Sequence, residues 1–189
     1  MTHETTLTRT VAAGLNAKNL LLVVAGSAVI AIAAQISVPM FPVPMTLQTL
    51  AITLIGLTFG ARMAGVTLLL YLAEGAFGLP VFANGGAGLL KLAGPTAGFI
   101  WGFVAMAFLT GWLAKRGPSR GVVKLLLAAI VPAALLYVPG VLWLATVTGM
   151  DMATAFTVGA MPFLLGDLLK SGLAALMVSG GNSMLKRLR

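Results

Sequence analysis

The stretch NLLLVVAGSAVIAIAAQISVPMFPVPMTLQTLAITLIGLTFGA, residues 19–61, contains no charged side chain over its whole length. About 20 apolar residues are enough to cross the hydrocarbon core of a bilayer, so this stretch is too long for a single membrane span. It contains a break, VPMFPVPM at 38–45, where three prolines remove backbone donors and favour extended geometry. The stretch therefore predicts two helices, at about 19–38 and 46–61, joined by a stiff loop.

The composition of the whole chain points to the same environment. Of its 189 residues, 59% are hydrophobic and 8% are charged, and the mean hydropathy is +1.04. Soluble domains usually carry about 25% charged residues, so we predict an all-α integral membrane protein with one domain. Small residues also recur at a spacing of four, as in Gly94, Gly98 and Gly102, which predicts helices that approach each other closely.

Four further helices are predicted after residue 61. The third follows Arg62 and includes MAGVTLLLYLAEGAF, and a glycine-rich, irregular segment at 78–95 comes next. The fourth is PTAGFIWGFVAMAFLTGWLA, the fifth covers 125–150 with interruptions at Pro132 and Pro139, and the sixth covers about 160–177. We thus predict six transmembrane helices within 19–180, a polar tail without a cleavable signal peptide at 1–18, and a basic tail at 181–189.

The basic residues indicate how these helices are oriented. If six spans alternate, the basic side chains that flank the helices all fall on one side of the membrane, apart from Lys91. The positive-inside rule places that side, with both termini, in the cytoplasm of a cell whose inner (cytoplasmic) membrane holds this multi-pass chain. The net charge of +8 is then explained by basic residues at the helix ends that interact with anionic lipid headgroups, and we expect no nucleic-acid partner. The proline-rich and glycine-rich loops meet on the outer side.

Two charges, Asp167 and Lys170, lie within the apolar sixth helix, in PFLLGDLLKSG at 162–172. A spacing of three residues places them on one helix face, close enough to interact. Each charge costs roughly 2.5–3.5 kcal/mol in the middle of a membrane helix, and two apolar residues would avoid that cost. We therefore expect the pair to line a cavity and bind either a small zwitterion or a molecule with one acidic group and one N–H-rich group. The alternative is a pair that only holds this helix against its neighbours.

Four more residues are candidate contacts for such a ligand. Asn84 and Gly85 lie in the glycine-rich loop, where the backbone can approach a ligand closely, although a simple connecting loop would have the same composition. Gln48 lies in the first turn of the second helix, where Thr46 is expected to cap that helix. Tyr137 lies between the two prolines of the fifth helix, where a kink would direct its hydroxyl into the same cavity.

The sequence offers little for catalysis or metal binding. It has no cysteine, and its single histidine, His3, lies in the polar N-terminal tail. No G-x-x-x-x-G-K-[ST] pattern occurs, so we expect no nucleotide-binding loop in this chain. An intramembrane enzyme would have only Asp167, Lys170 and Glu74 as reactive groups, and a purely structural scaffold would leave two charges within a helix unexplained. We expect no enzyme, no cofactor and no metal.

Three long motifs resemble those of a known family. They are FPVPMTLQTL at 41–50, YLAEGAFGLPVFANGGAGLLKLAGPTAGFIWGF at 71–103 and PFLLGDLLKSGLAAL at 162–176. Together and in this order they resemble the BioY family, the biotin-specific S components of energy-coupling-factor (ECF) transporters. The resemblance extends from the first to the sixth helix. It implies six membrane helices and high-affinity capture of biotin from outside, beneath the loops that join helices 1–2 and 3–4.

The resemblance also implies site residues and partners. Asn84, Asp167 and Lys170 match positions of the family's binding site, and biotin offers a carboxylate and a ureido group; which end meets Lys170 is left open. Members of the family usually pair with a transmembrane coupling protein and two ATPase subunits, and some work without them, which would leave a homo-oligomer. An S component for another vitamin such as thiamine is the alternative, but cationic thiamine would gain nothing from a lysine.

Overall fold

The computed structural model describes residues 16–116 and 121–187. Within these residues lie seven α-helices, one 3-10 helix and a sheet of two short strands. The elements are α2 (Ala17–Gln35), β1 (Ser37–Val38), β2 (Met45–Thr46), α3 (Gln48–Phe59), α4 (Ala61–Ala76), η1 (Ala83–Gly85), α5 (Ala97–Lys115), α6 (Val122–Thr148), α7 (Met152–Gly159) and α8 (Met161–Arg187). Most of the predicted N-terminal tail, including His3, lies outside the described residues.

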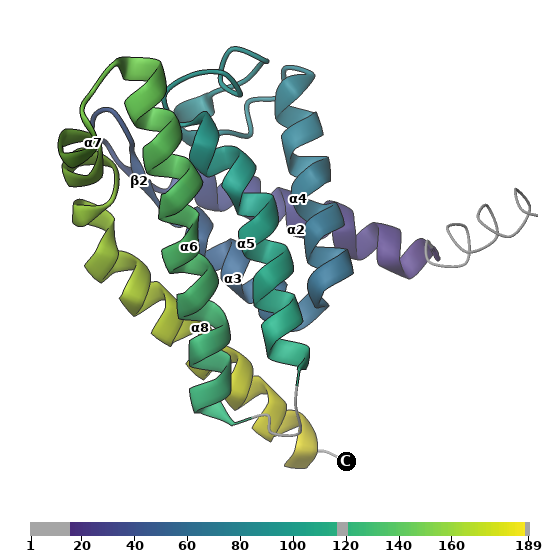
Figure 1. The fold of residues 1–189 in the computed structure, drawn as a ribbon. Coiled ribbons are helices and arrows are strands. Elements are labelled where there is room, and N and C mark those ends of the chain that lie inside the picture. The colour runs from purple at the N-terminus through teal and green to yellow at the C-terminus, as the bar shows by residue number, and fades with distance from the viewer. Residues whose placement is uncertain (1–15, 117–120, 188–189) are drawn as a thin grey trace, which may run out of the picture.

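The helices form a bundle whose loops gather at one end (Figure 1). α5 packs against α3, α4 and α6, while α8 packs against α6 and α3, and α2 packs mainly against α4. The links that follow α2, α4 and α6 lie at the upper end of Figure 1, and the last turn of α8 lies at the lower end. The predicted all-α fold is confirmed, with the two-stranded sheet as a small addition.

The outside of the bundle is apolar. Four leucine and isoleucine side chains illustrate this, with exposed fractions between 64% and 69%: Leu21, Ile32, Leu165 and Leu169. Such a surface matches the hydrocarbon of a bilayer rather than water. In the described part of the chain, α2, α5, α6 and α8 are long and apolar enough to cross a membrane. The predicted membrane character is therefore confirmed, with these four helices as candidate spans by length and composition.

α3 and α4 are shorter than the other long helices. They have 12 and 16 residues, or about 18 and 24 Å of helix, against a hydrocarbon core of roughly 30 Å. Gly60 separates them with a φ of 79°, a conformation that glycine adopts without steric cost. Lys115 Nζ, at the end of α5, donates to the carbonyl of Phe59 at 3.4 Å, so this turn lies at the lower end of the bundle. Six full spans stay a prediction.

Two helices differ from their predicted form. α6 is continuous from Val122 to Thr148 with Pro132 and Pro139 inside it, so the predicted interruption is wrong. Neighbouring helices compensate for backbone groups that a proline leaves unpaired in a membrane helix, which makes continuity possible. α8 runs to Arg187 and includes most of the predicted C-terminal tail. Gly180, Gly181 and Asn182 are poor helix formers, so local propensity does not explain this continuation. A helix that has already formed extends by one hydrogen bond per residue, which favours continuation into the good helix formers Leu185, Lys186 and Arg187.

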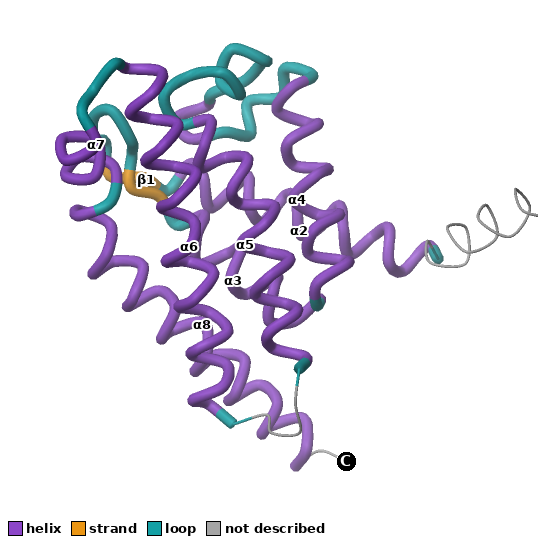
Figure 2. The backbone as a smooth tube through the Cα atoms, in the orientation of Figure 1, coloured by secondary structure: helices purple, strands orange, loops and turns teal. Residues whose placement is uncertain are grey.

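Two loops cover the upper end of the bundle, as Figure 2 shows in teal. We call residues 36–47 the proline hairpin; its strands β1 and β2 pair antiparallel, with Ser37 opposite Thr46. We call residues 77–96 the glycine loop; it contains η1 and an antiparallel bridge between Phe82 and Gly86. The end of α2 holds this loop, because Gln35 Nε2 donates to the carbonyl of Phe82 at 3.1 Å. Extended and irregular geometry is thus present where it was predicted.

Candidate functional site

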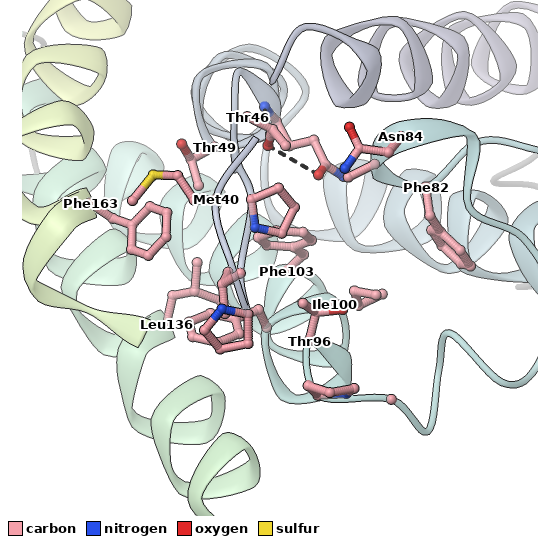
Figure 3. Close-up of a pocket in the computed structure, with 18 of the residues that line it drawn as sticks. Met40, Thr46, Thr49, Phe82, Asn84, Thr96, Ile100, Phe103, Leu136 and Phe163 are labelled. Atoms are coloured by element: carbon pink, nitrogen blue, oxygen red, sulfur yellow. Dashed lines mark hydrogen bonds between the residues drawn. The ribbon is translucent and has the colours of Figure 1, made fainter. Parts of the chain in front are cut away.

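A cavity of about 400 Å³ lies beneath the proline hairpin and the glycine loop (Figure 3). Its volume falls in the range of small-molecule pockets, which is about 300–1,000 Å³. The two loops and helices α3, α5, α6 and α8 all contribute to its lining. Most of the lining is apolar, and its phenylalanines are Phe41, Phe82, Phe99, Phe103 and Phe163. A ligand here is surrounded largely by rings and aliphatic groups.

Asp167 and Lys170 line this cavity from α8 and contact each other. Lys170 Nζ lies 3.0 Å from Asp167 Oδ1, so the interaction expected from their spacing is present. The side chain of Asp167 is only 8% exposed and that of Lys170 only 15%, so both charges are largely withdrawn from solvent. Removing two charges from water is costly, and further hydrogen bonds are needed to offset the cost.

Two hydroxyl groups supply those bonds. Thr49 Oγ1, on α3, donates to Asp167 Oδ1 at 2.7 Å and accepts from Lys170 Nζ at 3.1 Å. The hydroxyl of Tyr137, on α6, donates to Asp167 Oδ2 at 2.6 Å. We call Thr49, Tyr137, Asp167 and Lys170 the polar cluster. It joins three helices at the wall of the cavity.

The two charges of the polar cluster differ in what they can still bind. Lys170 Nζ also donates to the carbonyl of Thr46 at 2.8 Å, so all three donors of the ammonium have partners. A carboxylate has about four acceptor positions, and Asp167 uses three of them. The cluster can therefore accept an N–H group from a ligand without losing any bond that it already has. A ligand carboxylate would have to displace one of the partners of Lys170.

Asn84 and Gln48 also line the cavity, as predicted, but in different states. Asn84 has a left-handed φ of 57°, which asparagine tolerates better than most residues, and its Oδ1 accepts from Ser37 Oγ at 2.8 Å. Gln48 is engaged at both ends of its amide. Its Nε2 donates to the hydroxyl of Tyr71 at 2.8 Å, and its Oε1 accepts from Thr46 Oγ1 at 3.1 Å. The Asn84 amide nitrogen thus keeps its donors for a ligand, whereas Gln48 braces the wall.

Gly85 lies outside the cavity lining. Its N–H donates to Gln35 Oε1 at 2.9 Å, and its φ is 66°. It therefore shapes the glycine loop next to Asn84. The N-cap of α3 is Leu47, which makes no side-chain cap hydrogen bond, so the expected capping by Thr46 is wrong. The Thr46 hydroxyl instead accepts from the N–H of Gln48, the first residue of α3, at 3.2 Å.

Two residues of the site were not identified from the sequence. Thr49 follows Gln48 by one residue, and only the packing of α3 against α8 shows that it contacts the charge pair. Lys91 lines the cavity from the glycine loop, although its position in the chain indicated only an outer surface. The tip of the proline hairpin, residues 40–44, also lines the cavity, where the resemblance placed the loop between the first two helices. The available sequence signal for Lys91 was that it is the only charged residue in a loop rich in glycine.

Among the residues that the structure describes, no group of three or more His, Cys, Asp or Glu side chains is arranged to hold a metal ion. The charged groups in the cavity lining are Lys91, Asp167 and Lys170. Binding in this cavity therefore depends on hydrogen bonds, on the charge of these three residues and on apolar contact.

The sequence and the fold are similar to those of known proteins. A family model described as the BioY family matches residues 3–187. The biotin transporter BioY of Rhizobium etli is 40% identical over 149 residues, which cover 75% of this chain and 79% of that protein. The biotin transporter BioY of Thermotoga maritima is 37% identical over 151 residues, covering 80% and 88%. A crystal structure of the S-component for biotin from an ECF-type ABC transporter has the same fold, with a TM-score of 0.79, 23% identity and coverage of 97% and 95%.

Proposed function

This chain belongs to the BioY family, and on that basis we propose that it binds biotin and takes part in its uptake across the cytoplasmic membrane. It acts as the substrate-binding S component of an ECF-type vitamin transporter and performs no chemistry on its ligand. The observation that carries this proposal is the polar cluster in the wall of a largely apolar cavity, because ligand binding explains why two costly buried charges are present there.

The chemistry of biotin fits the lining of the cavity. Its ureido group has two N–H donors and a carbonyl acceptor, its ring system is apolar, and its side chain ends in a carboxylate. Asp167 has an acceptor position for an N–H group, and the amide nitrogen of Asn84 is a donor for the carbonyl. The phenylalanine rings supply apolar contact for the rest of the bicyclic system.

Charge favours biotin over thiamine. The charged residues in the lining are two lysines and one aspartate, so the cavity has a formal charge of plus one. A monoanion such as biotin neutralises that charge, whereas cationic thiamine would increase it. Like charges brought together inside a low-dielectric site are disfavoured.

The orientation and the partners are part of the proposal. All six long helices cross the membrane, with both termini in the cytoplasm and the two loops outside. The position of Arg62, Lys115 and Arg116 at the lower end of the bundle supports this orientation, because basic residues favour the cytoplasmic side. The chain works with a transmembrane coupling protein and two ATPase subunits, or as a homo-oligomer when it acts alone.

A binding measurement followed by an uptake measurement tests the function. Radiolabelled biotin should bind to the purified chain in detergent, and an excess of unlabelled biotin, but not of thiamine, should displace it. Uptake is then compared between cells that express the chain alone and cells that also express the coupling module. Displacement by thiamine at the same concentrations, or no binding of biotin at all, would contradict the proposal.

A further inference from the structure

Lys91 stands apart from the other charged residues of the cavity. Its side chain is exposed, yet it lines the cavity from the glycine loop. Within the described chain its ammonium group has no hydrogen-bond or ion-pair partner, whereas Asp167 and Lys170 have each other. The unbalanced positive charge of the lining therefore belongs to Lys91.

The glycine loop makes room for this side chain. A Cβ atom placed on Gly86 would lie 2.9 Å from Lys91 Cε and 3.3 Å from its Cδ. The aliphatic part of Lys91 thus lies directly against Gly86, where any larger residue would push it away. The lysine side chain can therefore lie along the loop beside the cavity.

The polar cluster is a poor partner for a carboxylate. All three donors of Lys170 have partners in the chain, and the negative charge of Asp167 lies 3.0 Å from its ammonium group. A second carboxylate at this point would displace a hydrogen bond and face a like charge. The same place suits an N–H group, since Asp167 has an acceptor position left.

From these contacts we propose that Lys91 binds the carboxylate of the ligand at the solvent side of the cavity, while the N–H-bearing end faces Asp167. The inference rests on the proposed function in one respect, that the ligand has a carboxylate and a separate group with N–H donors. Lys91 then sets the preference for an acid over its neutral derivatives. A lysine that only anchors the loop to lipid headgroups would set no such preference.

Biotin and its primary amide, which lacks the negative charge, separate these roles. Their affinities are measured for the parent, for Lys91→Gln and for Leu90→Gln, which changes an 88% exposed neighbour outside the lining. The parent and Leu90→Gln should bind biotin about two- to fivefold more tightly than the amide, the range of an exposed ion pair. Lys91→Gln should remove this difference and leave the affinity for the amide unchanged.

The other outcomes overturn the inference in distinguishable ways. If Lys91→Gln keeps the preference for the acid, or weakens both ligands equally, Lys91 does not bind the carboxylate. A parent that binds both ligands equally tightly likewise contradicts the inference but leaves the proposed function intact. A parent that binds neither ligand removes the proposed function, and the inference with it.

Discussion

At the scale of single residues, hydrogen-bond donors of the protein take the place of water around the carboxylate of Asp167. Lys170, Thr49 and Tyr137 donate to it over distances of 2.6–3.0 Å. Each donor lies on a different helix, so the position of the carboxylate depends on how α3, α6 and α8 pack together. A ligand that bonds to Asp167 therefore meets a group that is already oriented, which lowers the cost of binding.

Thr49→Val tests the contribution of the hydroxyl to this arrangement. Valine has the same shape, but it leaves one donor of Lys170 and one acceptor position of Asp167 without a partner. Losses of this kind cost about 1–3 kcal/mol, so we expect a lower thermal midpoint and roughly ten- to hundredfold weaker binding of biotin. Calorimetry and equilibrium binding in detergent measure the two effects.

Thr58→Val is the matched control for this change. Thr58 lies on the same helix, and its hydroxyl bonds to the carbonyl of Leu54 within that helix at 2.6 Å. Its replacement should leave binding unchanged. Equal losses of affinity in both variants would mean that Thr49 acts only through the stability of α3.

The residues of the site were predictable to different degrees. Asp167 and Lys170 were recognisable because two charges at helical spacing in an apolar segment are costly and conspicuous. Thr49 is 118 residues away from Asp167 in the chain, and a threonine in a membrane helix has many ordinary roles. Lys91 is the only charge in the glycine loop, but a lysine in an outer loop is ordinarily a surface residue, so this signal alone did not assign it to the cavity. Contacts between distant segments account for what was missed.

At the scale of elements, α5 and α6 approach each other at a glycine. A Cβ atom on Gly98 would lie 2.4 Å from the carbonyl oxygen of Pro139 and 2.4 Å from Cβ of Trp143. The indole N–H of Trp143 also donates to the carbonyl of Gly94 at 2.9 Å, just before α5 begins. A Cβ atom on Gly102 would likewise lie 2.7 Å from Leu136 Cδ1 of α6, so all three glycines at four-residue spacing serve this contact, as the spacing predicted.

Gly98→Ala should destabilise the bundle. The added methyl group would overlap the backbone of α6, which cannot move aside as a flexible side chain can. Overpacking of this kind costs about 1–3 kcal/mol, so the thermal midpoint in detergent should fall. Gly172→Ala is the comparison, because a Cβ atom there has no atom within 4 Å and alanine favours a helix over glycine. Equal midpoints for the two variants would contradict the close contact.

Local composition predicted the existence of the helices better than their ends. The proline-rich and glycine-rich segments are irregular where expected, because in them proline or positive φ values interrupt regular structure. Pro132 and Pro139 carry the same local signal but lie inside α6. Packing of α6 against α5 and α8 determines whether the helix continues through these prolines, and the local sequence of one segment does not contain those contacts.

At the scale of the whole molecule, the charges divide between the two ends of the bundle. Arg62, Lys115 and Arg116 lie at the end opposite to the proline hairpin and the glycine loop. Because the chain has no native cysteine, the orientation can be measured with single cysteines. Leu90→Cys, in the glycine loop, should react with a membrane-impermeant maleimide on intact cells.

Ser183→Cys, in the last turns of α8, should react only after the cells are opened. Both side chains are exposed in the structure, so access across the membrane is the only difference between them. The opposite pattern would place the cavity on the cytoplasmic side and contradict capture from outside.

The central claim is that the buried pair of Asp167 and Lys170 exists to hold a ligand, and one binding measurement tests it most directly. In the double variant Asp167→Leu/Lys170→Leu both charges are removed together, so a folded bundle is expected with a thermal midpoint near that of the parent. We predict that this folded variant binds biotin at least about a hundredfold more weakly, since hydrogen bonds to charged groups contribute about 1.5–3 kcal/mol each. A folded double variant with the affinity of the parent would contradict the account.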